Sequence, residues 1–463
     1  MTLDLARLLS TDGPDKYDLH NRYLNTQMVR VLRTIGFDRN YVRGKGQYLY
    51  DQDGHAHLDL LSGFGSFAIG RNHPTVIAAL QEVLGGELPN LVQMDVPVLA
   101  GVLAQRLLAY MPGMEKMFFC NSGAEAVEAS IKFARFATGR SRIIFCEHAF
   151  HGLTNGALSL NGDANYRGGF EPLLPGCTAV PFNELERLEA ELARGDVAAF
   201  IVEPIQGKGV NMPAGDYLRE AARLCHKHGA LFVADEIQTG VGRTGRFLAI
   251  EHWDVDADMV LLAKALSGGF IPVGAVAAKK WVYDKVFDRM DRAVVHGSTF
   301  AKNDMAMAAG LATLEIIESE GLIRHADVMG DAILGDLAAM VGRHEFVKEV
   351  RGKGLMIGIE FDKPQSLTLK AAWALLEQAR KGLFCQMIII PLMQDHRILS
   401  QVAGDNMNVI KLLPPLTITD VDRAWIRDGF NAAIADAHRV PGAIWDLGRT
   451  LAGGGIKARA GAA

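Results

Sequence analysis

The amino-acid sequence predicts an α/β fold with a mostly parallel central sheet covered by helices on both faces, together with a smaller α+β domain. From about residue 72, short and strongly apolar runs alternate with longer amphipathic stretches. Such runs are typical of parallel strands buried on both faces, and the stretches between them are typical of crossover helices. The chain has 463 residues, of which 49% are hydrophobic, which is enough for a large core and two domains.

The predicted elements follow in a regular order. Residues 40–60 alternate short apolar pairs with Gly and Asp turns, which predicts a small antiparallel unit. The strands of the central sheet are predicted at Met117–Cys120, Arg142–Cys146, Ala198–Glu203, Leu231–Ala234, Met259–Leu262 and Gly274–Ala277. The helices between them include Ala124–Thr138, Leu185–Ala193 and Tyr217–His228. Beyond about residue 330, helix-like segments flank Lys348–Glu360 and Gly382–Ile390, which predicts the smaller α+β domain.

These patterns predict four parts of the chain. An N-terminal segment, residues 1–70, is expected to contribute to the small domain, and residues 71–330 form the large domain. Residues 331–440 form the C-terminal small domain. The last part, residues 441–463, is rich in Gly and Ala and is expected to be a loose tail.

Composition argues against several classes of protein. The net charge is -5, so no basic excess indicates nucleic acid or an anionic membrane as a partner. No apolar run is long enough to span a membrane, and the N-terminus lacks the basic region of a secretory signal. The five cysteines are widely spaced without a CxxC pair, which is typical of reduced thiols. We therefore expect a soluble, cytoplasmic protein. Close histidine pairs lack a third ligand at suitable spacing, so no metal site is expected.

Two neighbouring apolar runs end in an acid and in an amine. In the segment Leu231–Gly240, the apolar strand Leu231–Ala234 is followed by Asp235. The next strand is followed by Lys264 in Leu-Leu-Ala-Lys-Ala-Leu-Ser-Gly-Gly. Adjacent strands of this kind bring both side chains to one edge of the sheet. A pyridoxal 5'-phosphate (PLP) enzyme needs such a pair: the lysine forms a Schiff base with the cofactor aldehyde, and the acid pairs with the pyridinium nitrogen.

A third segment suits the phosphate of such a cofactor. Cys120–Lys132 places a small polar turn, with Ser122, Gly123 and Ala124, at the start of a helix. The free amide groups and positive end of a helix bind phosphate, and Ser122 adds a hydroxyl. An ordinary helix cap is the simpler explanation of this turn on its own, but the pair of Asp235 and Lys264 favours phosphate binding.

These motifs, in this order, resemble the class III (ornithine/omega-type) aminotransferases, PLP-dependent enzymes of fold type I, over roughly residues 20 to 435. The resemblance implies that Phe150, beside His151, stacks on the cofactor ring. It also implies that Gln238 reaches the ring hydroxyl and that Glu203 lines the site. In this family the segment around Thr299 crosses to the partner subunit's phosphate, which implies a homodimer with shared active sites.

Three positions depart from the family pattern and concern the substrate. Leu153 and Lys411 stand where many members have an arginine that binds a carboxylate, and Lys208 stands where many have a glutamate. Lysine offers a mobile point charge instead of the planar fork of arginine. Lys208 and Lys411 either hold a dicarboxylic partner together, or the site favours a compound whose reactive end is not an α-amino acid. Phe64 and Phe67 match a substrate-lining segment and are apolar.

We therefore expect an aminotransferase that moves an amino group between a primary amine or omega-amino compound, or its aldehyde, and an amino acid or 2-oxo acid such as glutamate or 2-oxoglutarate. The amine scaffold could be lipid-like or secondary-metabolite-like. An aminomutase or a decarboxylating transaminase on the same fold is the alternative. A nicotinamide dehydrogenase is a remote alternative, because the segment Gly240–Gly245 satisfies the GxGxxG pattern but does not directly follow a strand.

Overall fold

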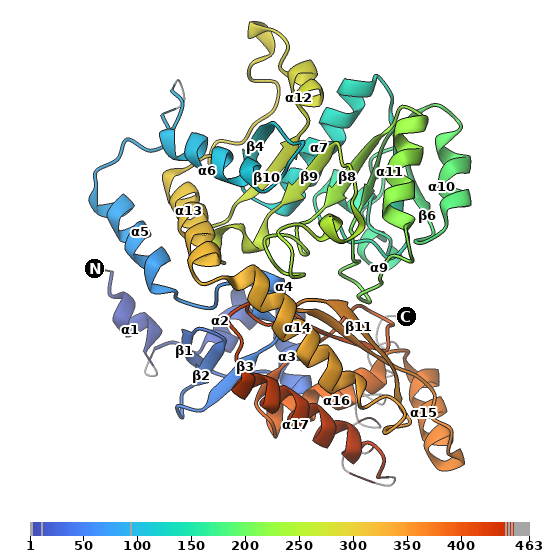
Figure 1. The fold of residues 1–463 in the computed structure, drawn as a ribbon. Helices are drawn as coiled ribbons and strands as arrows, with labels where there is room; N and C mark the ends of the chain where they lie inside the picture. Colours follow the sequence, from blue (N-terminus) through green and yellow to red (C-terminus); the bar gives the residue numbers. More distant parts are fainter. Residues whose placement is uncertain are drawn as a thin grey trace.

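The computed structural model describes residues 3–10, 13–92 and 95–439, together with Gly442, Trp445 and Gly448. The expected loose tail at 441–463 lies almost wholly outside these residues. Figure 1 shows an upper body built on one large sheet and a lower body that combines the N-terminal strands with the C-terminal third of the chain. No helix in the described ranges is long and apolar enough to cross a membrane.

The central sheet has seven strands in the order β4-β10-β9-β8-β7-β5-β6. Its strands are β4 (Lys116–Cys120), β5 (Arg142–Cys146), β6 (Cys177–Val180), β7 (Val197–Val202), β8 (Leu231–Asp235), β9 (Met259–Leu262) and β10 (Gly274–Ala278). β10 is antiparallel to both of its neighbours, and the other pairs are parallel. All residues of β5, β7, β8, β9 and β10 are buried, so both faces of the sheet are covered. The mostly parallel, helix-covered sheet predicted from the sequence is confirmed.

Helices pack on this sheet as their amphipathic patterns predict. α7 (Gly123–Thr138) contacts β7, β9 and β10, and α11 (Tyr217–Lys227) contacts β8 and α10 (Leu185–Leu192). Ser122 caps α7 through its hydroxyl, which accepts a hydrogen bond from the amide of Glu125, and Gly139 ends the helix in a left-handed conformation. The first turn of α7 is thereby held at the carboxyl end of β4.

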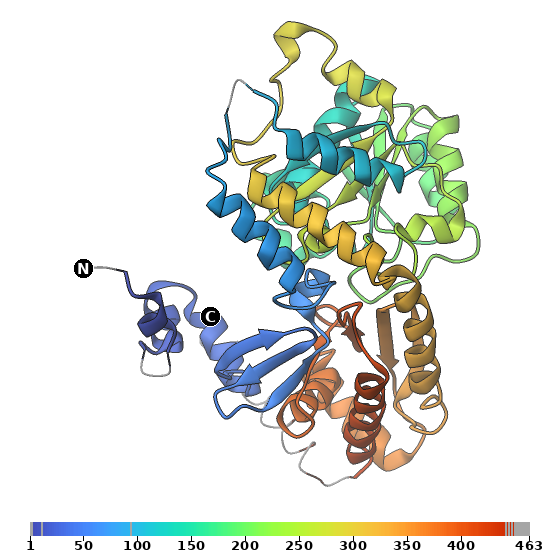
Figure 2. The same cartoon turned by 60° about the vertical axis from the view of Figure 1, so that its left-hand side comes forward.

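The lower body contains two four-stranded sheets (Figure 2). The first has the order β1-β2-β3-β13, with β1 (Tyr41–Lys45), β2 (Tyr48–Asp51), β3 (Ala56–Asp59) and β13 (Ile398–Leu399). The second has the order β11-β12-β15-β14, with β11 (Val347–Lys353), β12 (Met356–Phe361), β14 (Gln401–Val402) and β15 (Val409–Leu412). The N-terminal antiparallel unit and the α+β character of the C-terminal part are therefore confirmed.

One stretch of the lower body differs from the expectation. The segment Gly382–Ile390, which was expected to lie between helix-like segments, is itself part of helix α16 (Leu383–Gln394). Nearly every residue of α16 is buried, so its apolar run lacks the polar face that distinguishes a helix from a buried strand.

The remaining elements complete the two bodies. The α-helices are α1 (Leu5–Leu9), α2 (Lys16–Tyr23), α3 (Thr26–Ile35), α4 (Ser62–Gly65), α5 (Pro74–Gly85), α6 (Val98–Ala109), α8 (Asn155–Ser159), α9 (Ala164–Arg167), α12 (Lys280–Val286), α13 (Asp304–Ser319), α14 (Leu322–Ala338), α15 (Leu367–Ala379) and α17 (Asp420–Asp436). Short 3-10 turns lie at Ala249–Trp253, Lys264–Ser267 and Met290–Arg292. The expected domain boundary at residue 330 falls inside α14, which continues without a break into the lower body (Figure 1).

Candidate active site

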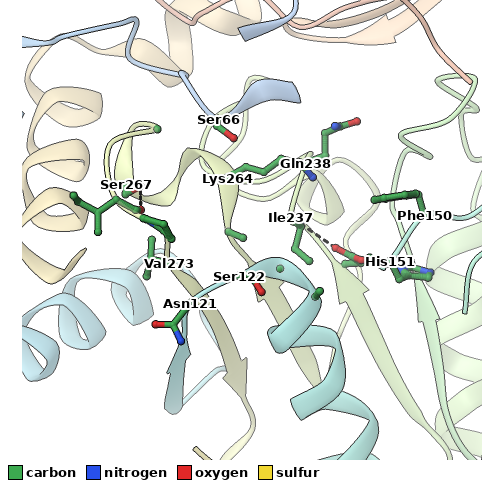
Figure 3. Close-up of a pocket in the computed structure, with 18 of the residues that line it drawn as sticks. Ser66, Asn121, Ser122, Phe150, His151, Ile237, Gln238, Lys264, Ser267 and Val273 are labelled. Carbon is green, nitrogen blue, oxygen red and sulfur yellow. Dashed lines mark hydrogen bonds and ion pairs between the residues drawn. The ribbon is translucent and has the colours of Figure 1, made fainter. Parts of the chain in front are cut away.

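A cavity of about 410 Å³ opens where several strands of the central sheet reach their carboxyl ends (Figure 3). This volume is in the range of sites for small molecules and cofactors. The cavity is lined by nine of the residues expected to bind a cofactor: Ser122, Gly123, Ala124, Phe150, His151, Glu203, Asp235, Gln238 and Lys264. The edge of the sheet thus brings together side chains from five separate segments.

The pairing of β8 and β9 explains why the acid and the amine share this cavity. Asp235 is the last residue of β8 and lies opposite Leu261 of β9 in a parallel register. Lys264 begins the 3-10 turn directly after β9. Parallel neighbours end at the same edge of a sheet, so the two side chains meet there.

The Lys264 amine is available for reaction. The backbone of Lys264 has a positive φ of 39°, a conformation that residues other than glycine rarely adopt. Such conformations are concentrated at functional sites. Within the described part of the chain, no hydrogen bond or ion pair engages its ammonium group. Burial lowers the pKa of Lys264, and the carboxylates of Asp235 and Glu203 oppose this only in part. A lysine with a lowered pKa has a larger share of nucleophilic neutral amine.

Asp235 is held by two donors. Its Oδ1 accepts a hydrogen bond from the Ile237 amide at 3.1 Å, and its Oδ2 lies 2.6 Å from Nδ1 of His151. Burial opposes protonation of His151, but the hydrogen bond and the charge of Asp235 outweigh it and raise the pKa of His151. Among the described residues, none forms a hydrogen bond with the buried Nε2 of His151. His151 therefore holds the Asp235 carboxylate in place, and Asp235 still lines the cavity.

Glu203 is a second buried acid at the cavity wall. Its Oε2 accepts a hydrogen bond from the amide of Phe150 at 3.0 Å, and its Oε1 accepts one from the amide of Gly207 at 2.9 Å. Burial raises the pKa of Glu203. Through the first of these bonds the carboxylate fixes the backbone that presents the Phe150 ring.

These groups fit pyridoxal 5'-phosphate. The first turn of α7, at Ser122, Gly123 and Ala124, offers free amides to a phosphate at one end of the cavity. A free lysine amine for the aldehyde and a carboxylate for the ring nitrogen lie in the same space. An α/β sheet of this order around such a donor set defines a PLP-dependent transferase of fold type I.

The chain belongs to the class III aminotransferase family, whose model matches residues 33–434. It is 35% identical over 444 residues to aminotransferase PigE of a Serratia species, covering 88% of this chain but only 52% of that protein. It is 36% identical to an ornithine aminotransferase of Bacillus cereus, covering 85% of this chain and 93% of that one. Among solved structures, an amine transaminase of an uncultivated Pseudomonas species in its PLP-bound form has a TM-score of 0.75 and 30% identity. That match covers 86% of this chain and 94% of the amine transaminase.

The chain is therefore an aminotransferase that uses PLP and acts on amine or amino acid substrates. The resemblance inferred from the sequence motifs is confirmed for the family, the fold, the cofactor and the class of reaction.

The residues expected to contact substrate lie around the cavity and not on its lining. Phe64 is 55% exposed, and its carbonyl accepts a hydrogen bond from Nε2 of Gln238 at 3.1 Å. Phe67 packs against Gly269, which lines the cavity, and Leu153 is an exposed side chain that follows the lining residue Gly152. Each of these three residues neighbours a lining residue through a contact or along the chain, and their contact with substrate stays a prediction.

Lys208 is occupied by partners that the sequence did not indicate. Its ammonium lies 3.0 Å from Oδ2 of Asp163 and 4.2 Å from the centre of the Tyr166 ring. The same ammonium group lies 5.7 Å from the centre of the Phe150 ring. Because Asp163 already neutralises this lysine, binding of a substrate carboxylate by Lys208 would have to compete with a partly buried ion pair.

Lys411 lies in β15 and is also buried. Its ammonium donates hydrogen bonds to the carbonyl of Gly207 at 2.6 Å and to Oε1 of Gln238 at 3.1 Å. Burial, reinforced by the charge of Lys264, lowers the pKa of Lys411 to about 7. The role of Lys411 in binding a carboxylate stays a prediction.

Thr299 lies elsewhere on the molecule. With its neighbour Ser298 it lines a second, larger hollow of about 1620 Å³, whose lining comes mainly from residues 88–92, 95–99 and 283–304. Asn121, which lines the first cavity, donates a hydrogen bond to the hydroxyl of Ser298 at 2.6 Å. Thr299 therefore does not line the cofactor cavity of its own chain, although its neighbour Ser298 contacts a residue that does.

Several lining residues were not expected from the sequence. They are Ser66, Asn121, Gly152, Ile237, Ala263, Ser267 and Gly269–Val273. Ser66, Asn121, Gly152, Ile237 and Ala263 are each adjacent to a predicted residue, whereas Ser267 and Gly269–Val273 lie further along the chain from Lys264. Asp163 caps the short helix α9, which contains Tyr166, and no motif in this segment indicated either residue.

Proposed function

We propose that this protein transfers an amino group between a primary amine or omega-amino compound, or its aldehyde, and an amino acid or 2-oxo acid. The observation that carries this proposal is the Lys264 amine, which has no hydrogen-bond or ion-pair partner in the described ranges and shares its cavity with Asp235. Phe64, Phe67 and Leu153, which neighbour lining residues, are apolar and favour an amine on a largely apolar scaffold. Lys411, which stands where the family pattern has a carboxylate-binding arginine, is bonded to protein oxygens, and Lys208, which stands where the pattern has a glutamate, is paired with Asp163.

The residues have distinct proposed roles. PLP, when bound, supplies an electron sink for the electrons of a broken C–H bond. Lys264 would hold the cofactor through its amine and, once released, would carry the proton between two carbon atoms. Asp235, braced by His151, would keep the ring nitrogen protonated, and Phe150 would stack on the ring. Gln238 would meet the ring hydroxyl, while Glu203 holds Phe150 in place and the first turn of α7 holds the phosphate.

A half-reaction panel tests the substrate class. Holoenzyme mixed with a neutral alkyl primary amine, without an acceptor, should release the matching aldehyde and leave the cofactor in its aminated form. An α-amino acid with an apolar side chain should react more slowly at equal concentration, because loss of a bidentate charged contact costs about 1.5–3 kcal/mol. Equal rates for both, or reaction with α-amino acids alone, would contradict the proposed amine preference. Return of the starting amine as its positional isomer would instead indicate an aminomutase.

We also propose a cytoplasmic homodimer with shared active sites, with a large domain at about 71–330 and a small domain made from 331–440 and the N-terminal segment. The support is the second hollow, which exposes Met290 and Val294 on the side where Thr299 lies. Exposed apolar side chains around a hollow of this size are typical of a surface covered by another chain. A second copy seated there would bring Thr299 to the partner's phosphate.

Hybrid dimers test the sharing of sites. Thr299→Ala should weaken cofactor binding about 10-fold, because one hydrogen bond to a charged phosphate is lost. When the Thr299→Ala chain is refolded together with an inactive Lys264→Ala chain, mixed dimers should form in which one of the two sites has both an intact Lys264 and an intact Thr299. Activity above the sum of the two separate variants is the expected result. A purely additive result, or a monomer in sedimentation, would reject the shared site.

A further inference from the structure

One run of hydrogen bonds joins four segments that are distant in sequence, those of Phe64, Gly207, Gln238 and Lys411. Lys411 in β15 donates to the carbonyl of Gly207 and to Oε1 of Gln238, at 2.6 and 3.1 Å. Nε2 of Gln238 in turn donates to the carbonyl of Phe64 at 3.1 Å. This run, called here the Lys411 relay, links β15 to the loop after β8 and to the N-terminal helix α4.

The relay determines which way the Gln238 amide faces. A lysine ammonium can only donate, so it must meet the oxygen of the amide, and a backbone carbonyl can only accept, so it must meet the NH₂ group. Both contacts select the same orientation. The NH₂ group has two N–H bonds, and only one of them is used by Phe64. Since Gln238 lines the cavity, the second N–H is left for an acceptor inside it.

Lys411 is suited to orient another side chain and poorly suited to receive a ligand. Its residue is 5% exposed, it does not line the cavity, and β15 pairs with both β12 and β14. No carboxylate in the described ranges forms an ion pair with it. Burial lowers the pKa of Lys411, and both its ammonium and its neutral amine carry the two N–H groups that the relay requires.

We propose that Lys411 is a positioning residue that acts through Gln238, holding its amide so that an N–H group faces the cofactor's ring oxygen. The inference rests on the proposed role of Gln238, and it replaces direct binding of a substrate carboxylate by Lys411. A side chain at this position that cannot donate frees Gln238 to turn its oxygen towards an oxygen of the cofactor, where two acceptors repel each other.

Lys411→Met in the holoenzyme tests this directly. We expect kcat to fall about 10-fold for amine and amino acid donors alike, with KM changed by less than about 2-fold, because the lost interaction does not involve the substrate. The pH at which the visible absorbance of the bound cofactor changes should move by about half a unit or more, as expected when a hydrogen bond to a titrating oxygen is weakened. A higher KM for amino acids only, with unchanged kcat and absorbance, would overturn the proposal in favour of carboxylate binding.

A double-mutant cycle tests whether the effect passes through Gln238. In a Gln238→Ala background, Lys411→Met should lower kcat by less than about 2-fold, because the oriented group is already gone. An undiminished effect in that background would overturn the proposal. Lys363→Met is the matched control, since it removes an exposed lysine of the same part of the chain and should change neither kcat nor the absorbance.

A second variant keeps the test independent of folding. Gln238→Glu retains an oxygen for Lys411 but has no NH₂ group, so it should reproduce the change in the absorbance titration even if Lys411→Met does not fold. An unchanged titration in Gln238→Glu would overturn the proposal. Failure of the proposed function is detected separately. If the visible absorbance of the enzyme does not depend on Lys264, the proposed function is wrong whatever the Lys411 variants show.

Discussion

Replacing Lys264 with alanine should lower kcat by more than about 10⁴-fold, the largest effect expected of any single substitution here. The substitution removes both the amine that would hold the cofactor and the base that would move the proton, and each of these contributes several orders of magnitude. The visible absorbance of the holoenzyme should change, and borohydride reduction should no longer attach the cofactor to residue 264. Peptide mapping of the reduced protein measures this attachment directly.

Lys279→Ala is the matched control for that experiment. Lys279 is also partly buried beside carboxylates, with its ammonium 2.9 Å from Asp256 and 3.1 Å from Asp258, but it does not line the cavity. We expect it to lower stability without changing kcat. Near-normal turnover of Lys264→Ala, with the parent protein labelled at another lysine, would reject the assignment of Lys264.

The central residues of the site could be predicted because they lie at strand ends. Asp235 and Lys264 each follow an apolar run whose length and composition indicate a buried parallel strand, and parallel strands end at one edge. The first turn of α7 carries its own signal, since Ser122 is a recognisable helix cap. What these residues share is that local sequence alone determines where each backbone segment ends.

The partners of these residues could not be predicted, because they depend on tertiary packing. Nothing in the sequence indicated that Asp163 would neutralise Lys208, since their segments meet only in the folded chain. The same holds for Lys411 and Gln238, which come from different bodies of the molecule. The prediction for Gly382–Ile390 was wrong for another reason. This segment is buried on nearly all sides, so its sequence lacks the periodic polar positions that distinguish a helix from a strand.

The charges around the cavity are balanced in a way that bears on the chemistry. Lys264 shares its buried surroundings with two carboxylates, Asp235 and Glu203, yet it is hydrogen-bonded to neither. A direct ion pair would stabilise the ammonium form and suppress its reactivity. Each carboxylate is instead engaged by other donors, His151 and backbone amides. The arrangement keeps the lysine near counter-charges while leaving its amine free to react.

Asp235→Asn should lower kcat by about 10²–10³-fold while the protein stays folded. The amide keeps an oxygen for the Ile237 N–H, but it has no charge with which to keep a ring nitrogen protonated or to stabilise a protonated His151. The pKa of His151 should therefore fall, because the hydrogen bond and charge of Asp235 are what raise it. Turnover measures the first effect, and NMR titration of the His151 ring measures the second.

Asp258→Asn separates this effect from the loss of any buried Asp–His pair. Asp258 is 3% exposed, as is Asp235, and its Oδ2 lies 2.9 Å from Nε2 of His226, but the pair lies outside the cavity. Both substitutions remove a buried carboxylate that a histidine contacts, so both should lower the unfolding temperature. Only Asp235→Asn should also lower kcat after correction for folded protein. If the two variants lose activity equally, the contribution of Asp235 is structural, and the electronic role assigned to it is wrong.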